Sequence, residues 1–500
     1  MFRVRTAENV VILVALQWLN RGLAVVTKIV LVRLLFPEDF GTFALAVGLL
    51  GFVSTFGNFG LDYAIVQKGP SATERDYDVG MTLRLLIAFV LFAVTFVLAN
   101  PWAQLFSTPI VSPTTQVLAL IYLVTPWSFV PSTRLVANLK FRAISVPSLV
   151  AQIANSALSI GLAFAGFRVW SLVLSFVAAQ VLATLTYIVV QPYRFHLSLD
   201  RGTVQSLLGF GRHLVFAALL GFLITNIDNF AIGYFLGSIA LGFYAVAYGI
   251  GYLPVALFST PAGAALFPSL AKIEADRSRL RSAYSESLSY AAAAILPTGV
   301  GLALIAPELV RVFFGPQWEP SILPLVVLGA YGACRALLDF SSSLFSAAGS
   351  PNEIARLNLY VLLLSVVLLF PLTLGMGIVG TAIAMTIPVF VVFLISIHRS
   401  AVVLDARPSD LIRSIRGPIL AAESMGVFVF LSKLALFAIA PSAVVIPFAD
   451  WAIRSETVVL LVLTPLGVVI YLVLLRIADR DVFEGLFRHG LVGLGRLRSP

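Results

Sequence analysis

The stretch RLLFPEDFGTFALAVGLLGF, residues 33–52, holds a short polar interruption, Pro37-Glu38-Asp39, between two long apolar runs. A membrane-spanning helix needs about 20 mostly apolar residues, and runs of that length lie on both sides of the interruption. Proline suits the first turn of a helix, and acidic side chains interact favourably with the dipole at a helix N-terminus. The stretch therefore predicts two spanning helices joined by a tight turn, with Pro37 at the start of the second helix.

The composition of the whole chain agrees with a membrane protein. Of its 500 residues, 59% are hydrophobic and 11% are charged, and its mean hydropathy is +0.99. A soluble domain is typically about 25% charged, so this chain cannot cover its surface with groups that water solvates. The net charge of +9 then indicates basic cytoplasmic loops rather than a nucleic-acid partner. The single cysteine, Cys334, excludes an intrachain disulfide and is expected to pack as a small hydrophobic residue.

We expect an all-α polytopic protein with about fourteen transmembrane helices. No long polar segment separates the apolar runs, and the first run is too long for the core of a signal peptide. The predicted spans are 9–35, 40–66, 80–100, 114–137, 146–166, 168–190, 207–233, 238–265, 284–306, 320–347, 353–374, 377–398, 411–440 and 455–477.

The distribution of Lys and Arg over the loops predicts the orientation. Loops on the N-terminal side carry about 24 of these residues and loops on the other side about 4, and cytoplasmic loops are the basic ones. Both termini are therefore expected in the cytoplasm, and the location is the bacterial cytoplasmic (inner) membrane. This orientation also requires an even number of spans.

A second copy of the opening stretch occurs about 201 residues later. When residues 33–46 are aligned with residues 234–247, Gly41 matches Gly242 and Leu35 matches Leu236. An offset of about six spans gives both copies the same orientation, which is typical of transporters built from two parallel repeats. Chance similarity between two apolar hairpins is the alternative.

Several segments resemble one known family. VLVRLLFPEDFGTFALAVGLLGFVSTFGNFGLDYAIVQ, NIDNFAIGYFLGSIALGFYAVAYGI (226–250) and FPSLAKIEADRSRLRSAY (267–284) resemble the bacterial polysaccharide transporters, which are Wzx-like oligosaccharide flippases. GPQWEPSILPLVVL (315–328) and AAGSPNEIARLN (347–358) are similar to that family around the tenth span. The superfamily also contains the multidrug and toxin extruders and the lipid II flippases. The likeness covers roughly residues 5–400 and includes the turns as well as the apolar runs.

The resemblance implies two six-helix lobes in a V around a central cavity, working by alternating access. The expected divisions are residues 1–200 and 201–405 for the lobes, 406–480 for two additional transmembrane helices and 481–500 for a cytoplasmic tail. The implied cargo is an undecaprenyl-diphosphate-linked oligosaccharide, moved to the outer leaflet with ion exchange for O-antigen, lipopolysaccharide or exopolysaccharide assembly. Membrane lipids, a polysaccharide polymerase and a chain-length regulator are the expected partners, and no cofactor, metal or nucleic acid is expected.

Ionisable groups inside the spans supply candidate binding residues, because such groups are costly in hydrocarbon and usually face a cavity or a partner. Arg21 and Lys28 are seven residues apart on one face of the first span, and Arg335 and Asp339 are four apart in the tenth. Guanidinium groups bind phosphate oxygens bidentately, and amides bond sugar hydroxyls. The predicted substrate-binding residues are Asn20, Arg21, Lys28, Arg84, Asn229 and Arg335. Asp62, Asp228 and Asp339 are predicted to serve ion coupling or charge pairing.

Structural roles compete with these assignments. Arg84 lies about one turn inside its predicted span and can reach water by snorkelling. Arg335 and Asp339 can satisfy each other on one helix, and Asp228 can pair with a cation or carry a coupling ion. Lys433 is expected near an interface. The pair Glu38-Asp39 is interpreted as a helix start rather than a substrate gate.

Three rival functions are weaker. A polymerase or ligase needs a sizeable outer loop and acid–base residues, whereas the outer loops are short and the four histidines lie near cytoplasmic span ends. We therefore do not expect an enzyme. A multidrug-type antiporter of the same superfamily would place acids and aromatics around a cation, whereas this chain places mostly cations in its spans. A scaffold without transport would have no use for such costly buried cations.

Overall fold

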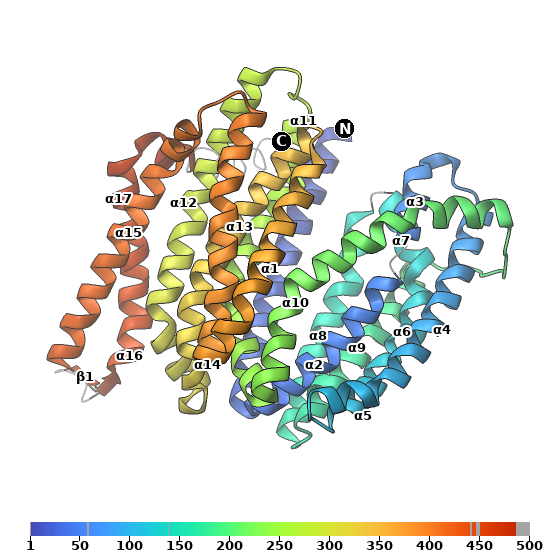
Figure 1. Cartoon of the computed structure of the whole chain (residues 1–500), viewed down its shortest axis with the longest axis horizontal. Coiled ribbons are helices and arrows are strands. Elements are labelled where there is room, and N and C mark those ends of the chain that lie inside the picture. Colours follow the sequence, from blue (N-terminus) through green and yellow to red (C-terminus); the bar gives the residue numbers. More distant parts are fainter. Residues whose placement is uncertain (1, 58–59, 139, 441–442, 447–450, 487–500) are drawn as a thin grey trace. The chain divides into compact units, whose positions relative to one another are not determined.

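The computed structural model describes the whole chain except residues 1, 58–59, 139, 441–442, 447–450 and 487–500 (Figure 1). Residues 1–245 form one compact unit and residues 246–500 a second. The first unit contains α1 (Phe2–Leu34), α2 (Pro37–Phe56), α3 (Leu61–Lys68), α4 (Glu74–Leu105), α5 (Val111–Ala119), α6 (Ile121–Val124), α7 (Phe129–Ala137), α8 (Phe141–Phe164), α9 (Val169–Val190) and most of α10 (Arg201–Gly251).

The second unit is also helical apart from a small ribbon. It contains α11 (Thr260–Ala271), α12 (Arg277–Leu309), α13 (Ile322–Ala347), α14 (Pro351–Val403), α15 (Pro408–Ile439), α16 (Ser455–Val458) and α17 (Thr464–Ala478). The strands β1 (Ala443–Ile446) and β2 (Trp451–Arg454) pair antiparallel between α15 and α16. Helices α12, α13, α14 and α15 lie side by side in this unit (Figure 1).

Two of the longest helices are hairpins that fold back at a glycine. In α10, Gly237 has φ 84° and ψ 176°, and in α14, Gly377 has φ 60° and ψ −142°. The Tyr244 hydroxyl lies 2.8 Å from the Asp228 carboxylate, 16 positions earlier. Sixteen residues of straight helix would place them about 24 Å apart. The chain therefore reverses at Gly237, as the sequence predicts for the turn at Gly237-Ser238.

Ten helical segments in the described part of the chain are long and apolar enough to cross a membrane. Two of the ten segments contain the hairpins of α10 and α14, and each of these two segments includes parts of two predicted spans. The predicted span 114–137 is instead divided into α5, α6 and α7, and the predicted span 40–66 into α2 and α3. The number fourteen remains a prediction. Breaks at Gly60, which has φ 58°, and at the Thr125-Pro126 turn account for the divided spans.

The turn at Pro37 is a capped helix start. Asp39 Oδ2 accepts a hydrogen bond of 3.0 Å from the Phe36 backbone N–H, and Pro37 occupies the first turn of α2. Arg168, just before α9, lies 3.3 Å from both the Glu38 and the Asp39 carboxylates. These contacts confirm the interpretation of Glu38-Asp39 as a helix start.

The two copies of the repeat contact each other reciprocally within the first unit. A Cβ atom added to Gly41 would lie 1.8 Å from the backbone oxygen of Ser238, and one added to Gly242 would lie 1.8 Å from that of Pro37. Ser238 and Gly242 stand 201 positions after Pro37 and Gly41. Gly41 of the first copy thus contacts Ser238 of the second, and Gly242 of the second copy contacts Pro37 of the first. Such an exchange of equivalent contacts is typical of a pair related by a two-fold axis. Only glycine allows the backbones to approach so closely.

Candidate functional site

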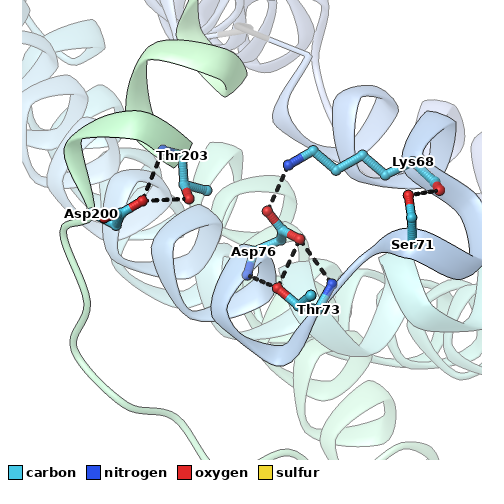
Figure 2. A network of polar contacts seen from close by, with 6 residues as sticks. All are labelled: Lys68, Ser71, Thr73, Asp76, Asp200 and Thr203. Atoms are coloured by element: carbon cyan, nitrogen blue, oxygen red, sulfur yellow. Dashed lines mark hydrogen bonds and ion pairs between the residues drawn. The ribbon is translucent and has the colours of Figure 1, made fainter.

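The start of α4 is fixed by the polar network in Figure 2. The Thr73 backbone N–H donates to Asp76 Oδ2 at 2.8 Å, and the Lys68 ammonium lies 2.6 Å from Asp76 Oδ1. This reciprocal cap satisfies helix N-terminal N–H groups, so α4 begins at Glu74 rather than at the predicted residue 80. Arg84 therefore lies about 15 Å along the helix axis from its start. The helix therefore extends further before Arg84 than the predicted span does, and the depth of Arg84 in the membrane stays a prediction.

The segment before α10 is tied to the same end of α4. The Asp200 carboxylate accepts hydrogen bonds from the Thr203 hydroxyl at 2.8 Å and the Thr203 N–H at 3.1 Å (Figure 2). Arg75 of α4 lies 2.8 Å from the same carboxylate. The Thr203 hydrogen bonds and then the Arg75 charge hold the pKa of Asp200 below its ordinary value. Because both ends of this contact belong to the first unit, the connection into α10 is anchored there.

Arg84 lines a cavity of about 410 Å³ inside the first unit, between α2, α4, α6 and α9. Its Nη1 atom is 3.5 Å from the backbone oxygen of Gly57, a long contact that leaves most of the guanidinium's donors without a described partner. Among the described residues that line this cavity, Arg84 is the only charged one, and Ser54, Tyr122, Thr125 and Gln180 are the neutral polar ones. The cavity therefore presents a single positive charge.

Asn20 belongs to a polar seam between α1 and α8. Its amide nitrogen lies 3.4 Å from Ser148 Oγ, and seven residues later the Thr27 hydroxyl lies 2.7 Å from Ser156 Oγ. Gln152, between those serines, donates to Ser156 Oγ at 3.2 Å. Asn20 Oδ1 is buried and accepts no hydrogen bond from a described residue. The seam was not predicted, because the sequence does not show that α8 is the partner of α1.

Arg21 and Lys28 lie on α1 next to the seam residues Asn20 and Thr27, and both side chains are half-buried. Their spacing of seven residues keeps them on one face, as predicted. Arg21 forms no ion pair with an acidic side chain in the part of the chain that the structure describes. Their predicted role in substrate binding stays a prediction.

The acidic candidates of the first unit lie apart from one another. Asp228 is fully buried and accepts hydrogen bonds from the Tyr244 hydroxyl and from the Asn229 backbone N–H at 2.9 Å. Asn229 is half-buried on the same helix, and Asp62 is exposed in the first turn of α3. Asp228 therefore pairs with a tyrosine hydroxyl, and no described ion pair includes it.

In the second unit, Arg335 and Asp339 lie close enough to three tyrosines, Tyr248, Tyr252 and Tyr331, for Arg335 to interact with them electrostatically. The Arg335 Nε atom lies 3.3 Å from Asp339 Oδ1, one helical turn away. The rings of Tyr248 and Tyr252 stack at 5.7 Å, and the hydroxyls of Tyr248 and Tyr331 are 3.4 Å apart. Nη1 of Arg335 is buried and has no hydrogen-bond partner among the described residues. The predicted helix pair exists, but it leaves one donor nitrogen open.

Lys433 has a partner that the sequence did not reveal. Its ammonium lies 2.8 Å from Glu308 Oε2 and donates to the Leu304 backbone oxygen at 2.5 Å, which joins α15 to α12. Only 13% of the lysine side chain and 4% of the glutamate side chain are exposed. A buried ion pair thus joins α15 to α12, and the prediction that Lys433 lies near an interface stays a prediction.

The nine predicted residues do not form one cluster within either unit. In the first unit, Asn20 lies in the seam, Arg84 in its cavity and Asp228 beside Tyr244. In the second unit, Arg335 and Asp339 lie together with their tyrosines. Among the described residues, no group of three or more His, Cys, Asp or Glu side chains could hold a metal ion.

Comparisons with known proteins agree with this architecture. Residues 30–323 match the family described as "Polysaccharide biosynthesis protein". The chain is 28% identical over 325 residues to the succinoglycan biosynthesis transport protein ExoT of Rhizobium meliloti, covering 64% of this chain and 65% of that protein, just under two thirds. It is 27% identical over 380 residues to the teichuronic acid biosynthesis protein TuaB of Bacillus subtilis, covering 75% and 77%. It is 23% identical to the lipopolysaccharide biosynthesis protein WzxC of Escherichia coli, covering 68% and 69%.

Solved structures agree at the level of the fold. An inward closed lipid II flippase, MurJ, superposes with a TM-score of 0.76 at 16% identity, covering 94% of this chain and 99% of that one. An inward-facing multidrug transporter of the MATE family superposes with a TM-score of 0.60 at 16% identity, covering 77% and 95%. The sequence match spans more than half of the chain. The chain therefore belongs to the polysaccharide biosynthesis protein family, as the sequence resemblance predicts, and is a multi-pass membrane protein with the fold that lipid II flippases and multidrug transporters share.

Proposed function

We propose that the protein moves lipid-linked oligosaccharide repeat units across the cytoplasmic membrane for the assembly of a surface or secreted polysaccharide. In this proposal the carrier is undecaprenyl diphosphate, the cargo goes from the cytoplasmic to the outer leaflet, and alternating access is coupled to an ion. Family membership and the fold shared with a lipid II flippase support the class of cargo. The Rhizobium meliloti relative is named as a transport protein, which supports a transporter.

The open guanidinium of Arg335 is the observation that carries the proposal. A buried donor without an acceptor is costly, commonly by about 1–3 kcal/mol, so its retention needs a reason. A guanidinium binds phosphate or sugar oxygens through a planar fork, and the tyrosine hydroxyls can donate or accept hydrogen bonds. Arg335, Asp339 and the three tyrosines together therefore suit a polyhydroxylated ligand with phosphate or hydroxyl oxygens.

The remaining assignments complete the proposal. Asn20, Arg21, Lys28, Arg84, Asn229 and Arg335 contact the cargo, whereas Asp62, Asp228 and Asp339 serve ion coupling or charge pairing. Both termini lie in the cytoplasm, because the basic loops are on that side. The working lobes are residues 1–200 and 201–405, followed by the helices of 406–480 and the tail 481–500. A polymerase and a chain-length regulator receive or organise the product.

Accumulation of the lipid-linked repeat unit tests the proposal. In cells that lack the gene, the repeat unit should build up on the cytoplasmic leaflet, where an externally added sugar-binding probe cannot reach it. The wild-type gene and the control Arg311→Gln, which changes an exposed pair with Glu319, should restore export. Arg335→Gln should not. Repeat units exposed on the outer leaflet but left unpolymerised would instead indicate a polymerase.

A multidrug-type antiporter is the second candidate, and the buried Asp228 carboxylate favours it. An acid without a cationic partner is the kind of group that takes up a proton or sodium ion when a cationic drug leaves. Efflux of a cationic dye that requires the protein and stops in Asp228→Asn, with normal repeat-unit export in the deletion strain, would establish this function instead.

A further inference from the structure

The cavity around Arg84 is too small for the whole cargo. Its volume of about 410 Å³ lies in the range of pockets for single small ligands, roughly 300–1,000 Å³. An oligosaccharide of several sugars on a lipid carrier does not fit in such a space. The cavity can hold one small group, and Arg84 gives that group a positive partner within the helical bundle.

The three hydroxyls that line the cavity can accept a hydrogen bond from a ligand but have no free proton to donate to it. The hydroxyl of Ser54 donates to the Gly51 backbone oxygen at 2.7 Å, that of Thr125 to Ile121 at 3.0 Å, and that of Tyr122 to Leu50 at 2.5 Å. Each hydroxyl has one proton and two lone pairs, so the lone pairs remain for a ligand. The cavity therefore combines one fixed cation, the Gln180 amide and three hydroxyl oxygens that can accept hydrogen bonds.

We propose that this cavity binds one acidic sugar residue of the cargo, with the sugar carboxylate on Arg84 and the ring hydroxyls donating to Ser54, Thr125 and Tyr122. The inference rests on the proposed function and specifies its substrate as a repeat unit that contains a uronate-like sugar. The carboxylate matches the planar guanidinium fork. The apolar part of the lining, which includes Phe176 and Pro126, packs against the C–H face of the ring.

The acceptor groups favour a sugar acid over the carrier's diphosphate. A diphosphate that joins a lipid to a sugar is fully ionised and esterified, so it has no O–H to donate. Against three hydroxyl oxygens whose protons already bond the backbone, it would place acceptor next to acceptor. A uronate has both the negative charge for Arg84 and the hydroxyl donors for these oxygens. Asp62, on the neighbouring α3, is exposed and does not line the cavity, although its carboxylate interacts electrostatically with Arg84.

Binding to the purified full-length protein in lipid nanodiscs is the first test. The probes are methyl glucuronide, methyl glucoside and inorganic pyrophosphate, and the measurement is the midpoint of thermal unfolding at increasing probe concentration. Methyl glucuronide should raise the midpoint of the wild type and of the control Arg311→Gln, and methyl glucoside should not. Arg84→Gln should weaken the glucuronide effect at least ten-fold, and Arg84→Lys should retain part of it.

A second variant keeps the test decisive if Arg84→Gln does not yield folded protein. Thr125→Val preserves the shape of the side chain but removes an acceptor, so it should weaken glucuronide binding several-fold. No stabilisation by methyl glucuronide, or equal stabilisation by methyl glucoside, would overturn the proposal. A larger effect of pyrophosphate that depends on Arg84 would assign the cavity to the carrier's phosphates and would overturn it as well.

Export in two hosts separates this inference from the proposed function. One host makes a repeat unit with a uronate, and the other makes a repeat unit of neutral sugars only. Arg84→Gln should reduce export of the uronate unit at least ten-fold relative to the neutral unit. Equal export of the uronate unit by Arg84→Gln and wild type would refute the acidic-sugar site and leave the flippase function intact. If the wild type moves neither unit, the flippase function itself is wrong and the cargo assignment fails with it.

Discussion

Lys433 and Arg335 are two buried cations of the same unit, yet their surroundings differ. Lys433 reaches from α15 to α12 and meets both Glu308 and a backbone oxygen, at 2.8 Å and 2.5 Å. Arg335 lies 3.3 Å from Asp339 on its own helix, and its Nη1 atom has no hydrogen-bond partner among the residues that the structure describes. The exposed side-chain fractions also differ, at 13% and 4% for the first pair and 18% and 29% for the second.

We propose that this difference separates a structural cation, Lys433, from a binding cation, Arg335. The Lys433 charge is neutralised by Glu308 on a neighbouring helix, and two of its three N–H donors bond α12, so this cation joins two helices. The Arg335 charge is paired on its own helix and keeps one donor nitrogen that has no partner among the described residues, and this donor suits a substrate oxygen. Unpaired charge in the sequence therefore does not by itself identify a binding residue.

The largest loss of stability should follow from removing one partner of the Lys433 pair. Lys433→Met leaves the Glu308 carboxylate buried without a counter-ion, and Glu308→Leu leaves the ammonium in the same state. Breaking a buried pair in this way costs about 3–5 kcal/mol. The midpoint of thermal unfolding in nanodiscs should fall strongly in both single variants.

The double variant Lys433→Met with Glu308→Leu is the control for that result. With no charge left unpaired, stability should return close to that of the wild type, and export should be retained. A double variant that folds normally but no longer exports would show that this pair also takes part in transport. The distinction between Lys433 as a structural cation and Arg335 as a binding cation would then be wrong.

The second effect is on export rather than on stability. Arg335→Met removes the open guanidinium and leaves Asp339, which is partly exposed and can be solvated. The loss of stability should stay within about 1–3 kcal/mol, smaller than for the Lys433 single variants. Export, measured as surface polysaccharide at equal protein abundance, should be abolished. Arg335→Lys should restore little of it, because lysine lacks the planar fork.

A third and smaller effect is expected for the tyrosine hydroxyls around Arg335. Tyr331→Phe removes the hydroxyl that lies 3.4 Å from the Tyr248 hydroxyl, and Tyr252→Phe keeps the stacked ring. Each should reduce export a few-fold and change stability by about 0.5–1.5 kcal/mol or less. If both variants export as the wild type does, the tyrosines only pack around Arg335, and their hydroxyls do not contribute to substrate binding.

The smallest effect is expected for an exposed ion pair at the end of the second unit. Arg480 lies 2.7 Å from Glu484 on the next helical turn, with 73% and 45% of the side chains exposed. Arg480→Gln should change neither the unfolding midpoint nor export measurably, because exposed pairs contribute little. A clear loss in this variant would mean that unfolding or abundance responds to any change of charge, and the other measurements would need to be scaled to it.

Local signals predicted the turns well. Pro37, Glu38 and Asp39 indicate a helix start from residue types alone, and the structure places the cap there. The glycine turn at Gly237 was likewise visible, because an apolar run too long for one span must reverse. The start of α4 was missed because Asp76 and Lys68 count as polar residues, although together they cap and neutralise the helix end.

Partners that are distant in sequence could not be predicted. Glu308 lies 125 residues before Lys433, and Ser148 lies 128 residues after Asn20. Hydropathy identifies helices but does not say which faces meet, since nearly every face of a span is apolar. The cavity around Arg84 was missed for the same reason, because four separate helices enclose it. The candidate cations were therefore found individually, whereas their grouping and their partners required the structure.

The reciprocal contact of Gly41 and Gly242 has a consequence for how this chain can change over generations. Each glycine faces the backbone of the opposite repeat copy rather than a side chain. No substitution elsewhere can make room for a larger residue, because a peptide oxygen is the same whatever the neighbouring amino acid is. The two positions are therefore constrained independently and cannot show compensating pairs of substitutions. If the chain arose by duplication of a gene for a symmetric homodimer, one ancestral glycine would have filled both places, and the fused descendant would have to conserve it twice.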